Sequence, residues 1–152
     1  MMLEIKAEHL QVIKQEAIKF YPHECCGLLV GTKQNDRTSI IEVIPTLNDW
    51  ENQKQIFSQF DNYDDRQCRD TFSIDPLTML QVQKQAREKK LAIVGIYHSH
   101  PDHPAIPSEF DRKFAWQEYS YIIVTVAKKS VTDLRSWILN SDHVFQEESI
   151  TS

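Results

Sequence analysis

The apolar run Leu-Ala-Ile-Val-Gly-Ile-Tyr at positions 91–97 constrains the fold of this chain more than any other feature. It is the most hydrophobic segment of the sequence, and polar residues stand on both sides of it. A short, continuous apolar run of this kind is typical of a strand that is buried on both faces. We therefore expect a strand at 91–97 in the centre of a sheet, with other elements covering both sides of that sheet.

The segment before this strand has the pattern of a helix. Asp75 is a good N-cap, and Pro76 stands at the first helical position, where its missing N–H costs nothing. The helix should extend to about Lys89, with Leu77 and Leu80 among the residues that face the core.

Helical and extended patterns alternate along the rest of the chain. Helices are predicted at Leu10–Phe20 and Ser108–Gln117, and strands at Cys25–Gly31, Thr38–Ile44, Ser120–Ala127 and Val131–Leu139. The sequence contains no internal repeat and no linker. The expected fold class is therefore α/β, with one domain over residues 1–152 built around a single mixed sheet.

Residues 46–75 interrupt this alternation. The stretch is dense in Asn, Asp and Gln, yet it carries Trp50, Phe57, Phe60 and Tyr63. Long segments without regular structure are uncommon in compact domains. Two interpretations stay open: a polar surface insertion, or a flap whose aromatic side chains find apolar partners only when substrate is bound.

Composition excludes several classes of protein. A formal net charge of -5 argues against a nucleic-acid binder. No apolar run is long enough to span a membrane, and the three glycines cannot form a dinucleotide or phosphate-binding loop. The odd set Cys25, Cys26 and Cys68 favours buried thiols in a reducing cytoplasm over a disulfide framework, and adjacent Cys25 and Cys26 should point to opposite faces of a strand. A catalytic cysteine paired with a distant histidine is a weaker alternative.

The predicted central strand ends in Tyr97-His98-Ser99-His100-Pro101, so a His-x-His pair lies at the strand end. Side chains two positions apart on a strand share one face, so His98 and His100 can converge on one point, although such pairs also occur in ordinary loops. Ser108 and Asp111 have the spacing of a helix N-cap. Because three prolines turn the intervening loop back, Asp111 could also reach the two imidazoles. Two histidines and a carboxylate leave a fourth position for water, as in catalytic zinc sites.

A hydrolytic metal site of this kind also needs a proton carrier. Zinc lowers the pKa of its bound water towards 7, and a nearby carboxylate must take the proton and deliver it to the leaving amine. Glu24, at the start of the first buried strand, is the best candidate. Spacing alone leaves a catalytic role and a surface position equally open.

These residues together resemble the signature of the JAMM (MPN+, Mov34/MPN/PAD-1, JAB) metalloproteases. The matching segments are His98-Ser99-His100-Pro101, then six residues, then Ser108-x-x-Asp111, with Glu24 upstream in Glu-Cys-Cys-Gly-Leu-Leu-Val-Gly. The resemblance extends over about Leu10–Leu139 and is greatest to small single-domain bacterial members, cyanobacterial ones in particular. It implies the JAMM/MPN fold, which is similar to that of cytidine deaminases, with a curved mixed sheet flanked by helices.

The resemblance also implies a role for each residue. His98, His100 and Asp111 would bind one Zn²⁺ per chain. Glu24 would act as general base and then as general acid, and Ser108 would donate a hydrogen bond to the oxyanion.

The implied activity is that of a metallopeptidase or isopeptidase. It would hydrolyse the amide bond at the C-terminus of a ubiquitin-like or sulfur-carrier protein of the ThiS/MoaD type, removing an extension or a cysteine adduct. Two alternatives remain: a non-catalytic MPN scaffold that binds a partner protein, and a peptidase of small cysteine-containing peptides. The sequence leaves open the identity of the carrier and the oligomeric state, a homodimer included.

Overall fold

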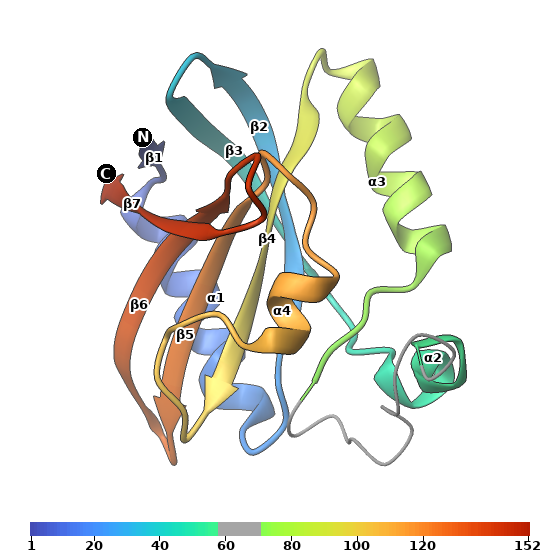
Figure 1. Cartoon of the computed structure of the whole chain (residues 1–152), viewed down its shortest axis with the longest axis vertical. Helices are drawn as coiled ribbons and strands as arrows, with labels where there is room; N and C mark the ends of the chain where they lie inside the picture. The colour runs from blue at the N-terminus through green and yellow to red at the C-terminus, as the bar shows by residue number, and fades with distance from the viewer. Residues whose placement is uncertain (58–70) are drawn as a thin grey trace.

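The computed structural model describes residues 1–57 and 71–152, which form helices and strands around one sheet (Figure 1). The helices are α1 (Ala7–Phe20), α2 (Trp50–Phe57), α3 (Pro76–Glu88) and α4 (Glu109–Lys113). The strands are β1 (Met2–Glu4), β2 (Cys26–Gln34), β3 (Arg37–Thr46), β4 (Ala92–Pro101), β5 (Ser120–Ala127), β6 (Ser130–Leu139) and β7 (Phe145–Thr151). Within the described residues, no helix is long and apolar enough to cross a membrane.

All the predicted helices and strands are present, with some changes at their ends. β4 extends to Pro101, so both histidines of the His-x-His pair lie at the end of the strand, as predicted. α4 is shorter than predicted, because it ends at Lys113 rather than at Gln117.

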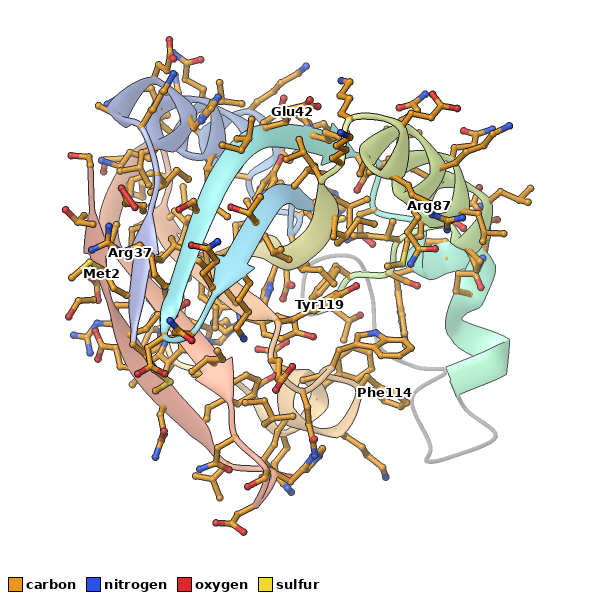
Figure 2. The ribbon with its side chains drawn as sticks, turned by 90° about the horizontal axis from the view of Figure 1, so that it is seen from above. Met2, Arg37, Glu42, Arg87, Phe114 and Tyr119 are labelled. Atoms are coloured by element: carbon orange, nitrogen blue, oxygen red, sulfur yellow. The ribbon has the colours of Figure 1, made fainter. Side chains whose placement is uncertain are left out.

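The strands form one mixed sheet in the order β1-β3-β2-β4-β5-β6-β7. β4 lies in the middle of this order, antiparallel to β2 and parallel to β5, which confirms its predicted central position. The sheet closes into a ring because β1 pairs in parallel with both β3 and β7. Figure 2 shows Met2 beside Arg37, its partner in the β1–β3 ladder. The α/β class is confirmed, while β1, β7 and the closure they produce were not predicted.

The two faces of the sheet bury separate hydrophobic clusters. α1 covers one face through Ile13 and Ala17, which lie one helical turn apart. Cys25 belongs to this cluster, whereas Cys26 belongs to the cluster on the opposite face, beneath α3. The predicted opposite orientation of the two thiols is therefore confirmed.

α3 covers the second face with a different stripe from the predicted one. Val82 and Ala86 are buried, and Met79 packs against the same cluster. Leu77 and Leu80 are 67% and 61% exposed, so the prediction that they face the core was wrong. The two sets are each spaced three or four apart, so helical periodicity alone does not decide which of them faces the sheet.

Part of the polar stretch 46–75 is regular structure. Trp50 begins α2 and is fully buried, with its ring edge-on to that of Phe110 at 5.4 Å between centroids. The beginning of the stretch is therefore packed against α4 through Trp50. Phe60 and Tyr63, on which the flap interpretation also depends, lie outside the described residues.

Candidate metal centre and active site

β4 places the two predicted histidine ligands on one buried face of the sheet. His98 and His100 are two residues apart on the strand, and both are buried. Their ring centroids lie 5.0 Å apart. The alternation of side chains along a strand therefore brings the two imidazoles together, as predicted.

α4 brings the predicted carboxylate to the same place. The side chain of Asp111 accepts a hydrogen bond from the N–H of Ser108 at 2.9 Å, and the Ser108 hydroxyl oxygen accepts one from the N–H of Asp111 at 3.1 Å. This reciprocal pair is a capping box at the start of α4. The same Asp111 oxygen lies 3.2 Å from Nε2 of His98 and 3.2 Å from Nε2 of His100. Capping and the approach to the imidazoles are thus compatible functions of one side chain.

The three side chains form a cluster with the donor set of a metal site. One potential ligand atom from each of His98, His100 and Asp111 lies within 4.8 Å of the other two. Nδ1 of His100 is 2.8 Å from the carbonyl oxygen of Pro104, which orients the ring and leaves Nε2 towards the cluster.

His98 provides the test of whether a metal ion fits here. Its ring stacks on that of Phe72, with centroids 4.5 Å apart and an angle of 22°. Both ring nitrogens are buried, and neither makes a hydrogen bond within the described part of the chain. A buried imidazole nitrogen that has no hydrogen-bond partner and lies beside a carboxylate oxygen and a second imidazole fits a Zn²⁺ ligand set.

The electrostatics of the cluster also suit a cation. Burial lowers the pKa of His98 and outweighs the opposing attraction of Asp111, so this imidazole is neutral. Burial alone would raise the pKa of Asp111, but the two histidines together hold it well below its usual range. For His100, burial is opposed by the hydrogen bond and charge of Asp111, which raise its pKa. The site thus holds a carboxylate and a neutral imidazole, the forms in which these groups bind metal ions.

Glu24 lies two residues before the start of β2. Cys26 pairs with His98 in the antiparallel ladder, so the chain just before β2 runs alongside the end of β4 that carries the two histidines. Ser99 reinforces this register, since its hydroxyl oxygen accepts from the Cys25 N–H at 2.8 Å and its N–H donates to the Cys25 carbonyl at 3.1 Å. Glu24 is 5% exposed. The surface position that spacing left open is therefore wrong, because Glu24 is buried.

Ser108 is exposed at the mouth of the cluster. Its hydroxyl oxygen is an acceptor in the capping box, which leaves the O–H proton available as a donor. The arrangement allows the side chain to cap α4 and to donate a hydrogen bond outwards at the same time.

Asn48 connects these parts, and the sequence interpretation missed it. Its amide nitrogen donates to the carbonyl oxygens of Glu24 at 3.1 Å and Thr71 at 2.9 Å. Its amide oxygen accepts from the N–H of Trp50 at 3.1 Å and of Ser73 at 3.2 Å. One side chain thereby ties the start of β2 to α2 and to the segment that carries the ring stacked on His98. An Asn that bonds the backbone two residues further on is an Asx-turn, and Asn48-Asp49-Trp50 is a sequence in which that turn could have been predicted.

The alternative of a cysteine nucleophile receives no support from Cys25. Burial raises the pKa of its thiol to about 12, which opposes formation of the reactive thiolate. Cys68 lies outside the described residues.

A mixed sheet with helices on both faces, and a cluster of two histidines and a carboxylate at the end of its central strand, defines an α/β protein with a candidate mononuclear metal centre. Residues 6–140 match the family described as prokaryotic homologs of the JAB domain, and the chain belongs to this family. The resemblance that the sequence motifs indicated is therefore confirmed.

Two relatives have names that describe an activity. The chain is 33% identical over 79 residues to a desampylase from Pyrococcus furiosus, an alignment that covers 52% of this chain and 54% of that protein. It is 43% identical over 49 residues to a probable TtuB-protein conjugate cleaving protease from Thermus thermophilus, covering 32% of this chain and 33% of the relative. The chain thus spans about half the length of the first relative and a third of the second.

Solved structures show the same fold. A solution structure of a protein from Desulfitobacterium hafniense has a TM-score of 0.73 and 27% identity, over 99% of this chain and 92% of that chain. A protein from Salinibacter ruber has a TM-score of 0.66 and 26% identity, over 99% and 90%. A JAB1/MPN domain protein from Archaeoglobus fulgidus, at 18% identity and a TM-score of 0.50 over the whole of both chains, is similar in fold alone.

Proposed function

We propose that residues 1–152 form a single metallopeptidase domain that binds one Zn²⁺ through His98, His100 and Asp111. Its substrate would be a ubiquitin-like protein or its conjugate, cleaved at the amide bond that follows the C-terminus of the ubiquitin-like part. A sulfur carrier of the ThiS/MoaD type is the partner we favour. The observation that carries the proposal is the single Asp111 oxygen at 3.2 Å from Nε2 of both histidines. The names of the two relatives, a desampylase and a conjugate-cleaving protease, support the class of substrate.

Bound zinc would supply a Lewis acid and would lower the pKa of a water molecule to near neutrality. The protein residues then have separate tasks. Glu24 takes a proton from the attacking water and returns it to the leaving amine; its burial just before β2, the strand that pairs with the histidine-bearing end of β4, supports this role. The Ser108 O–H donates to the carbonyl oxygen as negative charge develops there, and loss of such a donor typically costs about 10²–10³ in rate.

Glu24→Gln tests the proposal, because it keeps the shape of the side chain and removes its basicity. We expect one zinc per chain by elemental analysis and a fall in cleavage of a carrier-protein conjugate of at least about 100-fold, followed by mass spectrometry. Glu109→Gln is the matched control, since Glu109 is exposed and pairs only with Arg112 among the contacts described. It should retain both metal and rate.

Wild-type cleavage by Glu24→Gln would show that the assigned base is wrong. A wild-type protein that holds zinc and binds the conjugate without cleaving it would instead favour the scaffold alternative. Faster cleavage of short cysteine-containing peptides than of the conjugate would favour a small-peptide hydrolase.

A further inference from the structure

An apolar pocket opens directly beside the candidate metal centre. Its volume is about 140 Å³, and His98 and Asp111 form part of its lining. The rest of the wall is mainly aromatic and aliphatic, with Phe72, Ile74, Met79, Phe110, Phe114 and Tyr121. These residues come from the segment before α3, from α3 and α4, and from β5. Figure 2 shows Phe114 between α4 and the side of the molecule that carries α2 and α3.

The chemistry of the wall selects apolar occupants. No lysine, arginine or glutamate is among the described residues that line the pocket. The Tyr121 hydroxyl already accepts a hydrogen bond from the N–H of Trp116 at 2.6 Å. Apart from Ser73, the Tyr121 O–H and the edge formed by His98 and Asp111, the lining side chains offer no hydrogen-bonding group, so most of the wall gives a polar or charged group nothing in exchange for its water.

The size of the pocket selects among apolar groups. An apolar cavity of about 150 Å³ in a protein interior binds benzene. The pocket beside His98 is close to this size, so it matches a phenylalanine or leucine side chain. Glycine would leave it empty, and the indole of tryptophan would exceed it.

The pocket wall is held in place by the same contacts that organise the site. Phe72 lines the pocket and stacks on His98. The segment that carries Phe72 is fastened on both sides by Asn48, through Thr71 and Ser73. An occupant would thus meet a wall that is already ordered, which limits the entropy lost on binding.

We propose that this pocket binds one apolar side chain of the polypeptide substrate, of leucine or phenylalanine size, from a residue next to the bond that is cleaved. The inference rests on the proposed function, because it assigns a specificity pocket to that active site. The pocket shares His98 and Asp111 with the metal cluster, so a side chain seated in it fixes the adjoining amide at the cluster.

The first experiment measures occupancy without catalysis. Toluene is titrated into the zinc-loaded full chain, and the methyl resonance of Met79 is followed by NMR. We expect a saturable shift. Met79→Trp fills the pocket and removes the methyl probe, so the Phe114 resonances are followed in this variant, and they should not shift with toluene. Leu77→Trp is the control, because Leu77 is exposed on the same helix, and the Met79 shift should persist in it. Saturable binding that survives in Met79→Trp would overturn the proposal.

The second experiment measures preference. Conjugates that carry Gly, Leu, Phe or Asp at the residues flanking the scissile bond are compared by kcat/KM. Leu and Phe should exceed Gly by about 10- to 100-fold at one of these positions, and Asp should be the poorest. Met79→Trp should remove the preference, so that the Leu and Phe values fall to the Gly value measured in the same variant, whereas Leu77→Trp should keep the preference. Phe114→Ala enlarges the pocket, so with this variant a fifth conjugate that carries Trp should gain relative to Leu and Phe, which provides a second test if Met79→Trp does not fold.

Equal rates for all four residues, or an equal loss for all of them in Met79→Trp, would overturn the pocket assignment while leaving the proposed function intact. If the wild type cleaves none of the conjugates, the proposed function fails. The pocket assignment is then tested by measuring the equilibrium affinity of the wild type and of Met79→Trp for the same conjugates. A Leu or Phe preference that Met79→Trp removes would then support it, and equal affinities would overturn it.

Discussion

Asn48→Ala should destabilise the fold more than any other single substitution of an exposed or half-buried polar residue described above. The substitution removes a side chain that makes four hydrogen bonds to the backbone of three separate segments. At about 0.5–1.5 kcal/mol for each bond, the network contributes about 2–6 kcal/mol. Asn48 is only half-buried, so in the variant water can replace some of the lost hydrogen bonds. We therefore expect the free energy of unfolding to fall by about 2–4 kcal/mol.

Urea unfolding followed by circular dichroism measures this change. Asn48→Ala, the control variant and the wild type are all measured at the same zinc concentration, because a bound ligand shifts apparent stability by mass action. Asn52→Ala is the matched control, since Asn52 is an exposed asparagine whose side chain bonds Asp49 at 2.6 Å. Its loss should stay within about 0.5 kcal/mol. If Asn48→Ala loses no more than Asn52→Ala, the four bonds do not fasten the start of β2, and the reasoning is refuted.

Three further predictions concern the site and the core. Asp111→Ala should lose most of its zinc, because one of three ligands is gone, and an unchanged metal content by elemental analysis would leave Asp111 as a cap alone. Between pH 9 and 12 the unfolded chain ionises the Cys25 thiol while the folded chain keeps it protonated, so the free energy of unfolding should fall as pH rises. In Cys25→Ala this fall should be smaller by up to about 1.4 kcal/mol per pH unit in urea titrations, and identical slopes would contradict the assignment. Gly27→Ala would make its Cβ overlap with Cε2 of the buried Tyr97 ring, so the free energy of unfolding measured in urea should fall by about 1–3 kcal/mol. A fall below about 0.5 kcal/mol would show that the ring moves aside freely.

The features that the sequence predicted well are those set by neighbours along the chain. The alternation on β4 places His98 and His100 on one face, and the capping pattern after the prolines places Asp111 at the start of α4. Both rules act over a few residues, so the cluster could be predicted. The burial of Glu24 could not, because it depends on the register between β2 and β4.

The features that were missed depend on contacts distant in sequence. β1 has only three residues, too few to show any periodicity, and it is a strand because its backbone pairs with β3 and β7. The choice between the two apolar stripes of α3 is similar. Leu77 is more hydrophobic than Ala86, yet Ala86 is buried and Leu77 is exposed, because the position of the sheet relative to the helix decides which stripe is covered. Periodicity identified the helix but not the face that packs.

The closure of the sheet also bears on the order in which the chain acquires its structure. β1 and β7 both lie outside residues 6–140, which match the family, and their ladder joins Leu3 to Ile150. A loop of this length loses much entropy when its ends meet, so such a contact forms late. During synthesis, residues 2–4 cannot complete their pairing until residues 145–151 have emerged. The ring is therefore completed only after the strands that carry the candidate metal centre have been made, and the centre can assemble before the barrel is closed.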